Sequence, residues 1–237
     1  MRLNRVDYNG QSLEAYAGES IDAYTSKTFF WMFLGLLTTF GVAFFGYATG
    51  TILYVLAIPY AHILLLVAEL AVVIFLSVRL HKLHVGAARA LFFAYAALNG
   101  VFFSAYFLIF SMLSLILIFA MTAVYFGAMA LYGYFTKTDL SRLRPILVGG
   151  LIFLIVCGLL SLFIPLGMLD RVVCLIGIAI FLGFTAYDTQ KIGALYAYYR
   201  SDGEMLEKAS IFSALQLYLD FVNIFLYLLR FLGKRKN

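Results

Sequence analysis

Apolar runs of about 20 residues, the length at which a helix crosses the hydrocarbon core of a bilayer, recur along the whole chain. Hydrophobic residues make up 64% of the 237 residues and charged residues only 12%. A water-soluble domain of this size could not bury so much apolar surface. The runs also lack the alternation of polar and apolar residues that marks membrane β-strands. The sequence therefore predicts an all-α polytopic membrane protein.

We expect seven transmembrane helices, at residues 27–49, 60–80, 88–110, 112–134, 145–165, 171–190 and 209–232. Residues 1–26 are polar and mixed in charge, without the basic and then apolar pattern of a cleaved signal peptide. We therefore expect a retained polar tail at 1–26, followed by a single membrane domain at 27–237.

Lys and Arg gather in alternate connections between these segments, which indicates the cytoplasmic side of the membrane. Twelve of them fall on the side of the N-terminus: Arg2, Arg5, Lys27, Arg79, Lys82, Arg89, Lys137, Arg142, Arg144, Lys191, Arg200 and Lys208. The opposite loops carry only Arg171. The pattern predicts a cytoplasmic N-terminus, in a bacterial plasma (inner) membrane or, as the alternative, an organelle membrane.

The last segment conflicts with this charge pattern, because seven crossings place Arg230, Lys234, Arg235 and Lys236 on the opposite side. Two explanations stay open. The segment enters the membrane and returns without crossing it, or its position is dictated by packing rather than by charge.

Two aspartates, Asp188 and Asp220, lie inside the last two apolar segments. An ionisable side chain at membrane depth is expensive unless it finds a partner or water, so it is a candidate functional residue. Steps of three and four residues along the last segment place six polar side chains on one stripe: Ser213, Gln216, Asp220, Asn223, Tyr227 and Arg230. We expect this stripe to face other helices or a water-filled cavity, and the two carboxyls to meet in the cytoplasmic half. The structural alternatives are a polar seam that fixes helix register and, for Asp188, a helix end paired with Lys191.

Glu69 and Arg79 add charge to the second segment. Glu69 lies near mid-membrane, where a protonated or cavity-facing carboxyl is expected. Arg79 is either an interfacial arginine or a counter-ion for the aspartates. Cys157 and Cys174 lie at different depths, which argues against a disulfide, and no cysteine and histidine cluster indicates a structural metal or a cofactor. The chain shows no nucleic-acid-binding pattern.

Residues 186–192 (AYDTQKI) and 217–230 (LYLDFVNIFLYLLR) resemble the two signature stretches of the Bax inhibitor-1 family, also called the transmembrane Bax-inhibitor-motif or YccA/YetJ-like family. Residues 98–100 (LNG) and 135–141 (FTKTDLS) support the resemblance. One departure is the charged connection that we expect at residues 194–209.

The resemblance implies a fold of seven transmembrane helices, with two three-helix layers around a central C-terminal helix. It also implies a calcium-permeable leak gated by a pH-sensitive aspartate pair, matched by Asp188 and Asp220, with Arg79 as a latch. The remaining polar candidates for lining or supporting the pathway are Glu69, Gln216, Asn223 and Asn99.

A shared proton supplies the expected mechanism, because two close carboxyls do not both ionise cheaply. Ionisation of the pair would change its attraction to Arg79 and move the helices. Ca²⁺ prefers oxygen ligands, so both aspartates are also candidate Ca²⁺ ligands. The expected partners are thus the lipid bilayer, Ca²⁺ and protons.

Two further classes of function compete with a channel. Tyr187 and Asp188 resemble one motif of intramembrane aspartyl proteases, but Asp220 lacks the expected Gly-x-Gly-Asp setting, so an enzyme is the remote alternative. The other class, also implied by the resemblance, is a regulatory protein that binds and restrains a membrane-bound protease or cell-death machinery. For this class the tail is a candidate contact.

Overall fold

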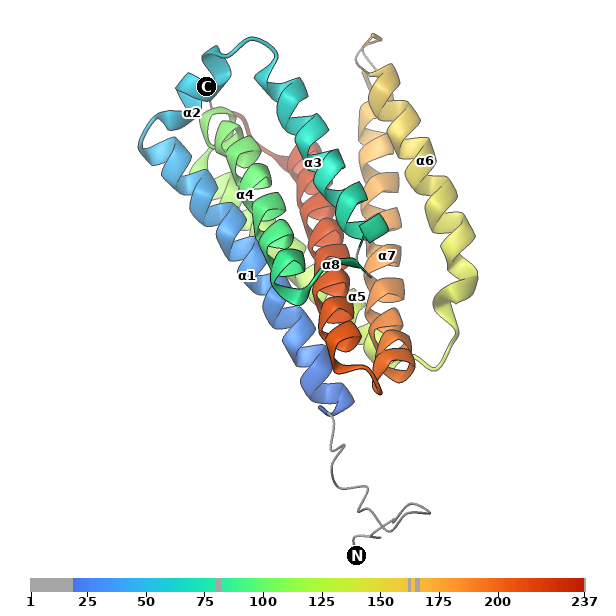
Figure 1. Ribbon diagram of the computed structural model, residues 1–237. Helices are drawn as coiled ribbons and strands as arrows, with labels where there is room; N and C mark the ends of the chain where they lie inside the picture. The colour runs from blue at the N-terminus through green and yellow to red at the C-terminus, as the bar shows by residue number, and fades with distance from the viewer. Residues whose placement is uncertain (1–18, 80–81, 162, 165–166, 237) are drawn as a thin grey trace, which may run out of the picture.

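The computed structural model describes residues 19–79, 82–161, 163–164 and 167–236, which fold as a bundle of helices (Figure 1). The elements are, in chain order, α1 (Ile21–Ala48), α2 (Thr51–Ala57), α3 (Ala61–Arg79), α4 (Val85–Ile109), α5 (Met112–Phe135), η3 (Leu140–Leu143), α6 (Arg144–Leu160), α7 (Leu169–Tyr199) and α8 (Gly203–Leu232).

Six spans within these described ranges are long and apolar enough to cross a membrane: α1, α4, α5, the combined η3 and α6, α7 and α8. This confirms the prediction of an all-α polytopic membrane protein. The predicted crossing at 60–80 corresponds to α3, a helix of 19 residues. The count of seven crossings and the two-layer arrangement stay predictions.

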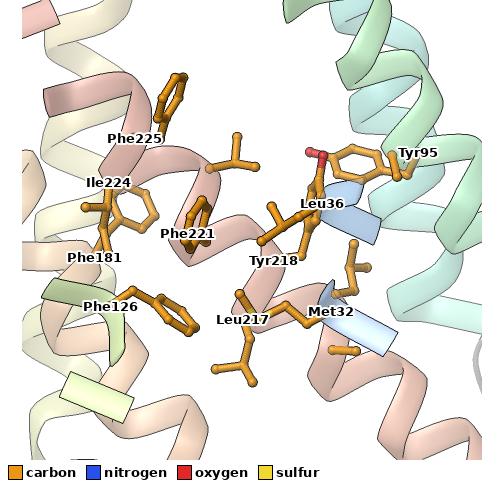
Figure 2. Packing of buried hydrophobic residues seen from close by; sticks show 14 of the residues in the cluster. Met32, Leu36, Tyr95, Phe126, Phe181, Leu217, Tyr218, Phe221, Ile224 and Phe225 are labelled. Carbon is orange, nitrogen blue, oxygen red and sulfur yellow. The ribbon is translucent and has the colours of Figure 1, made fainter. Parts of the chain in front are cut away.

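α8 is the most enclosed of the six spans, with 67% of its apolar window buried against 11% to 39% in the others. It packs on α1, α4, α5 and α7 (Figure 1). Figure 2 shows how its side chains divide: Leu217 and Tyr218 lie beside residues of α1, whereas Phe221 and Ile224 lie toward α5 and α7. The sequence places α8 inside the bundle because its polar stripe would be expensive against lipid.

The hydroxyl of Tyr218 anchors α8 to its neighbours on the α1 side. Tyr218 is fully buried, and its hydroxyl oxygen lies 2.7 Å from that of Thr39 on α1. The Thr39 hydroxyl is also 2.9 Å from the carbonyl oxygen of Ala96 on α4. Three helices thus meet at buried polar groups that all have partners, as the apolar interior requires.

The predicted long connection at residues 194–209 is wrong, because α7 continues to Tyr199 and α8 begins at Gly203. The Asp202 carboxylate caps α8 by accepting a hydrogen bond of 3.0 Å from the backbone N–H of Met205. Glu204, Glu207 and Lys208, which were expected in this connection, lie on α8 instead. Sequence alone did not reveal the partners of Glu207 and Lys208, which are distant along the chain.

Glu207 is the centre of these ion pairs. Its carboxylate oxygens lie 2.7 Å from Lys27 Nζ on α1 and 2.6 Å from Arg89 Nη2 on α4. The neighbouring Lys208 is only 4% exposed and donates to the carbonyl oxygen of Leu83 at 3.2 Å. The start of α8 is therefore fixed to α1 and α4 by charge-assisted hydrogen bonds.

α1 begins at Ile21, earlier than the predicted start at 27. The Ser20 hydroxyl caps the helix by accepting a 3.2 Å hydrogen bond from the N–H of Ala23, and Asp22 lies in the first turn, where negative charge is favoured. Residues 1–18 of the predicted tail lie outside the described residues.

The C-terminal segment does not turn back into the membrane. α8 is continuous over 30 residues, and the chain after it lies at the opposite end of the bundle from the start of α1 (Figure 1). There it bonds to the turn between α4 and α5: the backbone N–H of Lys236 donates to the Ile109 carbonyl at 2.9 Å. Of the two explanations for the C-terminal cations, packing is therefore the one that the structure supports.

Gly133 allows α5 to approach α7 beside Asp188, because a Cβ at this position would collide with the backbone carbonyl oxygen of Ala186. We expect Gly133→Ala to lower the free energy of unfolding by about 1 to 3 kcal/mol through overpacking. Thermal unfolding of the detergent-solubilised protein measures the change. Gly127→Ala on the same helix meets open space and should leave stability unchanged or slightly raised. Equal melting temperatures for the two variants would contradict the close approach.

Candidate functional site

Asp188 on α7 and Asp220 on α8 form the core of the candidate site. They are 6% and 4% exposed, and the two carboxyls are close enough for Asp188 to repel a charge on Asp220. α7 and α8 are extensively packed on each other, so the pair is enclosed between helices rather than turned to lipid. The sequence predicted both residues, and the structure brings them together.

Polar atoms without partners gather at this helix pair. Buried side-chain oxygens of Asp188, Thr189, Ser213 and Asp220 have no hydrogen-bond partner among the described protein groups. Two of these residues lie on α7 and two on α8. Buried polar groups nearly always find a partner, and a cluster of exceptions indicates a place where water or an ion is accommodated.

The cations that act on Asp188 are Lys191 and Arg144. Lys191 follows on the same helix, and its Nζ donates to the Gln216 side-chain oxygen on α8 at 3.2 Å. Arg144 is the first residue of α6. The sequence placed Arg144 only among the cytoplasmic cations, because its proximity to Asp188 depends on how α6 packs.

Arg79, the predicted counter-ion, is the last residue of α3 and is exposed. No ion pair joins it to an acidic residue within the described part of the chain. The structure thus brings together Asp188, Asp220 and Gln216, but not Arg79. The role of Arg79 as a latch stays a prediction.

The polar stripe of α8 faces α7 along its length. Gln216 bonds to Lys191, the Tyr227 ring packs on Gly177 and Phe181, and Arg230 forms an ion pair with Asp170. Beyond Asp220 the stripe enters a cavity of about 620 Å³, which opens at the C-terminal end of α8. Asn223, Tyr227, Arg230, Asp170 and Tyr106 are among its polar lining residues.

Asn223 connects this cavity to the aspartates. It lies three residues after Asp220, about 4.5 Å along the helix axis, and its amide donates to the Leu219 carbonyl at 2.8 Å. Asn223 therefore lines the cavity about one helical turn beyond Asp220.

Glu69 and Asn99 lie away from the pair. Glu69 is half-buried on α3, one of its oxygens has no protein partner in the described ranges, and it acts electrostatically on Tyr95 of α4 and Tyr218 of α8. Asn99 is buried on α4, and its amide donates to the Tyr95 carbonyl at 3.3 Å. Both therefore belong to the side of α8 that faces α4.

A tightly bound metal is not favoured by these residues. No group of three or more His, Cys, Asp or Glu that could hold a metal ion occurs in the described ranges, and both cysteines are free thiols. Two carboxylates supply only part of the six to eight oxygen ligands that Ca²⁺ takes.

Comparison with known proteins agrees with the motifs and with the helical architecture. A family model described as "Inhibitor of apoptosis-promoting Bax1" matches residues 21–237. The chain belongs to the Bax inhibitor-1 family. It is 38% identical to the inner membrane protein YbhL of Escherichia coli K12 over 99% of this chain and 100% of that protein. An uncharacterized protein of Borreliella burgdorferi is 36% identical over 90% of this chain and 93% of its own length.

A side chain absent from the predicted site joins two stretches that carry the Bax inhibitor-1 resemblance. Gln190, two residues after Asp188, accepts a 2.9 Å hydrogen bond from the N–H of Leu140 and donates at 2.8 Å to the carbonyl of Thr138. The connection between α5 and α6 is thereby attached to α7 next to the aspartate. The sequence feature that could have identified Gln190 is its position inside the AYDTQKI stretch, which carries the family resemblance.

Replacing Gln190 tests this attachment. Gln190→Met keeps the length of the side chain but leaves the N–H of Leu140 and the carbonyl of Thr138 unpaired. Because water can reach part of this contact, we expect the free energy of unfolding to fall by about 0.5 to 1.5 kcal/mol, measured by thermal unfolding. Lys137→Met, an exposed change on the same connection, is the control and should have little effect. A melting temperature for Gln190→Met equal to that of the control would contradict the attachment.

Proposed function

We propose that this Bax inhibitor-1 family protein is a calcium-permeable leak channel of the inner membrane, gated by protonation of the Asp188 and Asp220 pair. The family and the membrane-spanning helices establish an integral membrane protein. The observation that carries the proposal is the cluster of unpartnered polar oxygens on α7 and α8, which includes both carboxyls. A purely structural seam would satisfy these groups.

Protonation controls the packing of α7 on α8 in this proposal. With one shared proton the pair carries a single negative charge, which Lys191 and Arg144 face. Loss of that proton places a second charge between packed helices, where charge is expensive without water or a cation. The interface then either separates and hydrates or admits a cation, so that the proton acts as the switch.

The pathway uses the polar stripe of α8. An ion that enters the cavity at the C-terminal end meets Asn223 before Asp220. Oxygen groups along this route replace part of the hydration shell of a hard cation such as Ca²⁺, without forming a closed binding site. With the predicted orientation, the cavity faces away from the cytoplasm and the pair lies nearer to it.

Arg79 can act as a latch only in an arrangement of the helices other than the one described here. Arg79 is exposed at the end of α3, whereas Lys191 and Arg144 already face Asp188. The proposal therefore assigns the closed-state attraction to Lys191 and Arg144. Arg79 takes part only if α3 moves when the pair ionises.

Asp220→Asn tests the gate directly. The amide cannot ionise, so Ca²⁺ flux into proteoliposomes should lose its pH dependence between about pH 6 and about pH 8, the range in which perturbed carboxyls titrate. Fluorescent Ca²⁺ indicators inside the vesicles measure the flux.

Asp202→Asn provides the control for this experiment. Asp202 caps α8 at the end of the helix, about 27 Å along the axis from Asp220, and asparagine caps a helix equally well. This variant should keep the wild-type pH response. Asp220→Asn flux that still follows pH as in wild type would contradict the gate.

The second candidate is a regulator that acts by binding a membrane-bound protease or another membrane protein. The description of the matched family, which names inhibition, favours it. The aspartates would then be structural. Absence of Ca²⁺ flux at every pH, in vesicles whose protein is folded, would favour this candidate over the channel.

A further inference from the structure

An apolar groove on the surface of the bundle is not used by the proposed channel. It has a volume of about 380 Å³ and is lined by side chains of α1, α4, α5 and α8. Leu37 of α1 and Ile116 of α5 stand at its walls, and each is 58% exposed. The groove therefore opens to the surroundings of the helices, which at this depth are lipid acyl chains, and its volume lies within the range of ligand sites, roughly 300 to 1,000 Å³.

Aromatic rings make the floor of the groove. Phe40, Phe103, Phe119 and Phe225 come from four different helices, with ring centroids 4.7 to 6.4 Å apart. Rings packed edge to face in this way hold one another in place. The groove is therefore a preformed surface rather than a gap that neighbouring side chains could fill.

The C-terminal cations are bonded to the helices at one end of this groove. Lys236 Nζ donates at 2.9 Å to the carbonyl oxygen of Phe107, a residue that lines the groove. The backbone N–H of Lys234 donates at 3.1 Å to the Ser114 hydroxyl on α5. The side chains of Lys234 and Lys236 are exposed, and within the described chain no acidic residue pairs with them. Arg235, between them, lines the polar cavity instead.

These cations are the ones that the charge distribution of the loops does not explain, since they lie at the opposite end of the bundle from the start of α1. An apolar groove with cations at one end matches both parts of an anionic lipid. Acyl chains match the groove, and a phosphate matches the lysine ammonium groups.

We propose that the groove between α1 and α5 holds an acyl chain of one anionic glycerophospholipid, whose phosphate contacts Lys234 and Lys236. The site is independent of the aspartate pair. Residues 233–236 follow α8 directly and bond to the helices at one end of the groove. A lipid bound there therefore makes the C-terminal end of α8 responsive to the lipid composition of the surrounding leaflet.

Lipid binding is measured on the full-length protein in detergent, with phosphatidylglycerol and phosphatidylcholine of identical acyl chains as probes. A ligand that binds only the folded state raises the melting temperature. Phosphatidylglycerol should raise the melting temperature more than phosphatidylcholine does, and native mass spectrometry should show one phosphatidylglycerol retained per chain.

Two variants separate the headgroup from the groove. Lys234→Gln with Lys236→Gln should reduce the phosphatidylglycerol shift to the phosphatidylcholine value, whereas Lys137→Gln with Arg142→Gln, the same loss of charge elsewhere, should not. Ile116→Trp obstructs the groove and should abolish retention of the lipid. Ile155→Trp on α6, where the isoleucine is similarly exposed at 55%, should retain it.

Three results would overturn the proposal. The first is an equal shift for both lipids in the wild-type protein. The second is full retention of phosphatidylglycerol by Ile116→Trp. The third is a concentration-dependent dimer that Ile116→Trp abolishes, which would assign the groove to a second copy of the chain.

Discussion

An ionisable side chain inside a bilayer must be enclosed by protein, and the arrangement of this bundle follows from enclosing Asp220. α8 carries Asp220 together with other polar side chains, so it can lie only where α1, α4, α5 and α7 surround it. The surrounding helices then meet lipid with their own apolar faces. The many exposed Leu, Ile, Phe and Val side chains on α1, α5 and α6 are consistent with this division.

The two faces of α8 differ in how their polar groups are satisfied. Toward α1, Ser210 pairs with Thr28 at 2.9 Å and Tyr218 pairs with Thr39 at 2.7 Å. Toward α7, oxygens of Ser213 and Asp220 have no partner within the described protein. The hydrogen bonds to α1 thus use buried hydroxyls that are all paired, whereas between the Lys191–Gln216 bond and the Asp170–Arg230 ion pair the α7 side carries unpaired oxygens, so a conformational change is expected there. The Glu207 ion pairs at the start of α8 hold the same α1 side.

Patterns of hydropathy and helical spacing predicted what depends on local sequence: the fold class, most crossing segments, the polar stripe and the two aspartates. They failed where the partner of a charge lies far away in the chain. Glu207 and Lys208 resembled a loop, because Lys27, Arg89 and Leu83 are distant in sequence. Arg144 and Gln190 were missed for the same reason. The start of α8 was misplaced because charged residues can continue a helix beyond the membrane when other helices pair with them.

The most direct test of the account measures whether the two carboxyls share a proton. Infrared difference spectroscopy of the lipid-reconstituted protein follows the protonated carboxyl band as the pH changes. The account predicts that Asp188→Asn changes the pH midpoint at which Asp220 titrates, and that Asp220→Asn changes the midpoint of Asp188, because each carboxyl acts on the other. Midpoints that are the same whether the neighbour is aspartate or asparagine would show that the two groups titrate independently, and would contradict the gate.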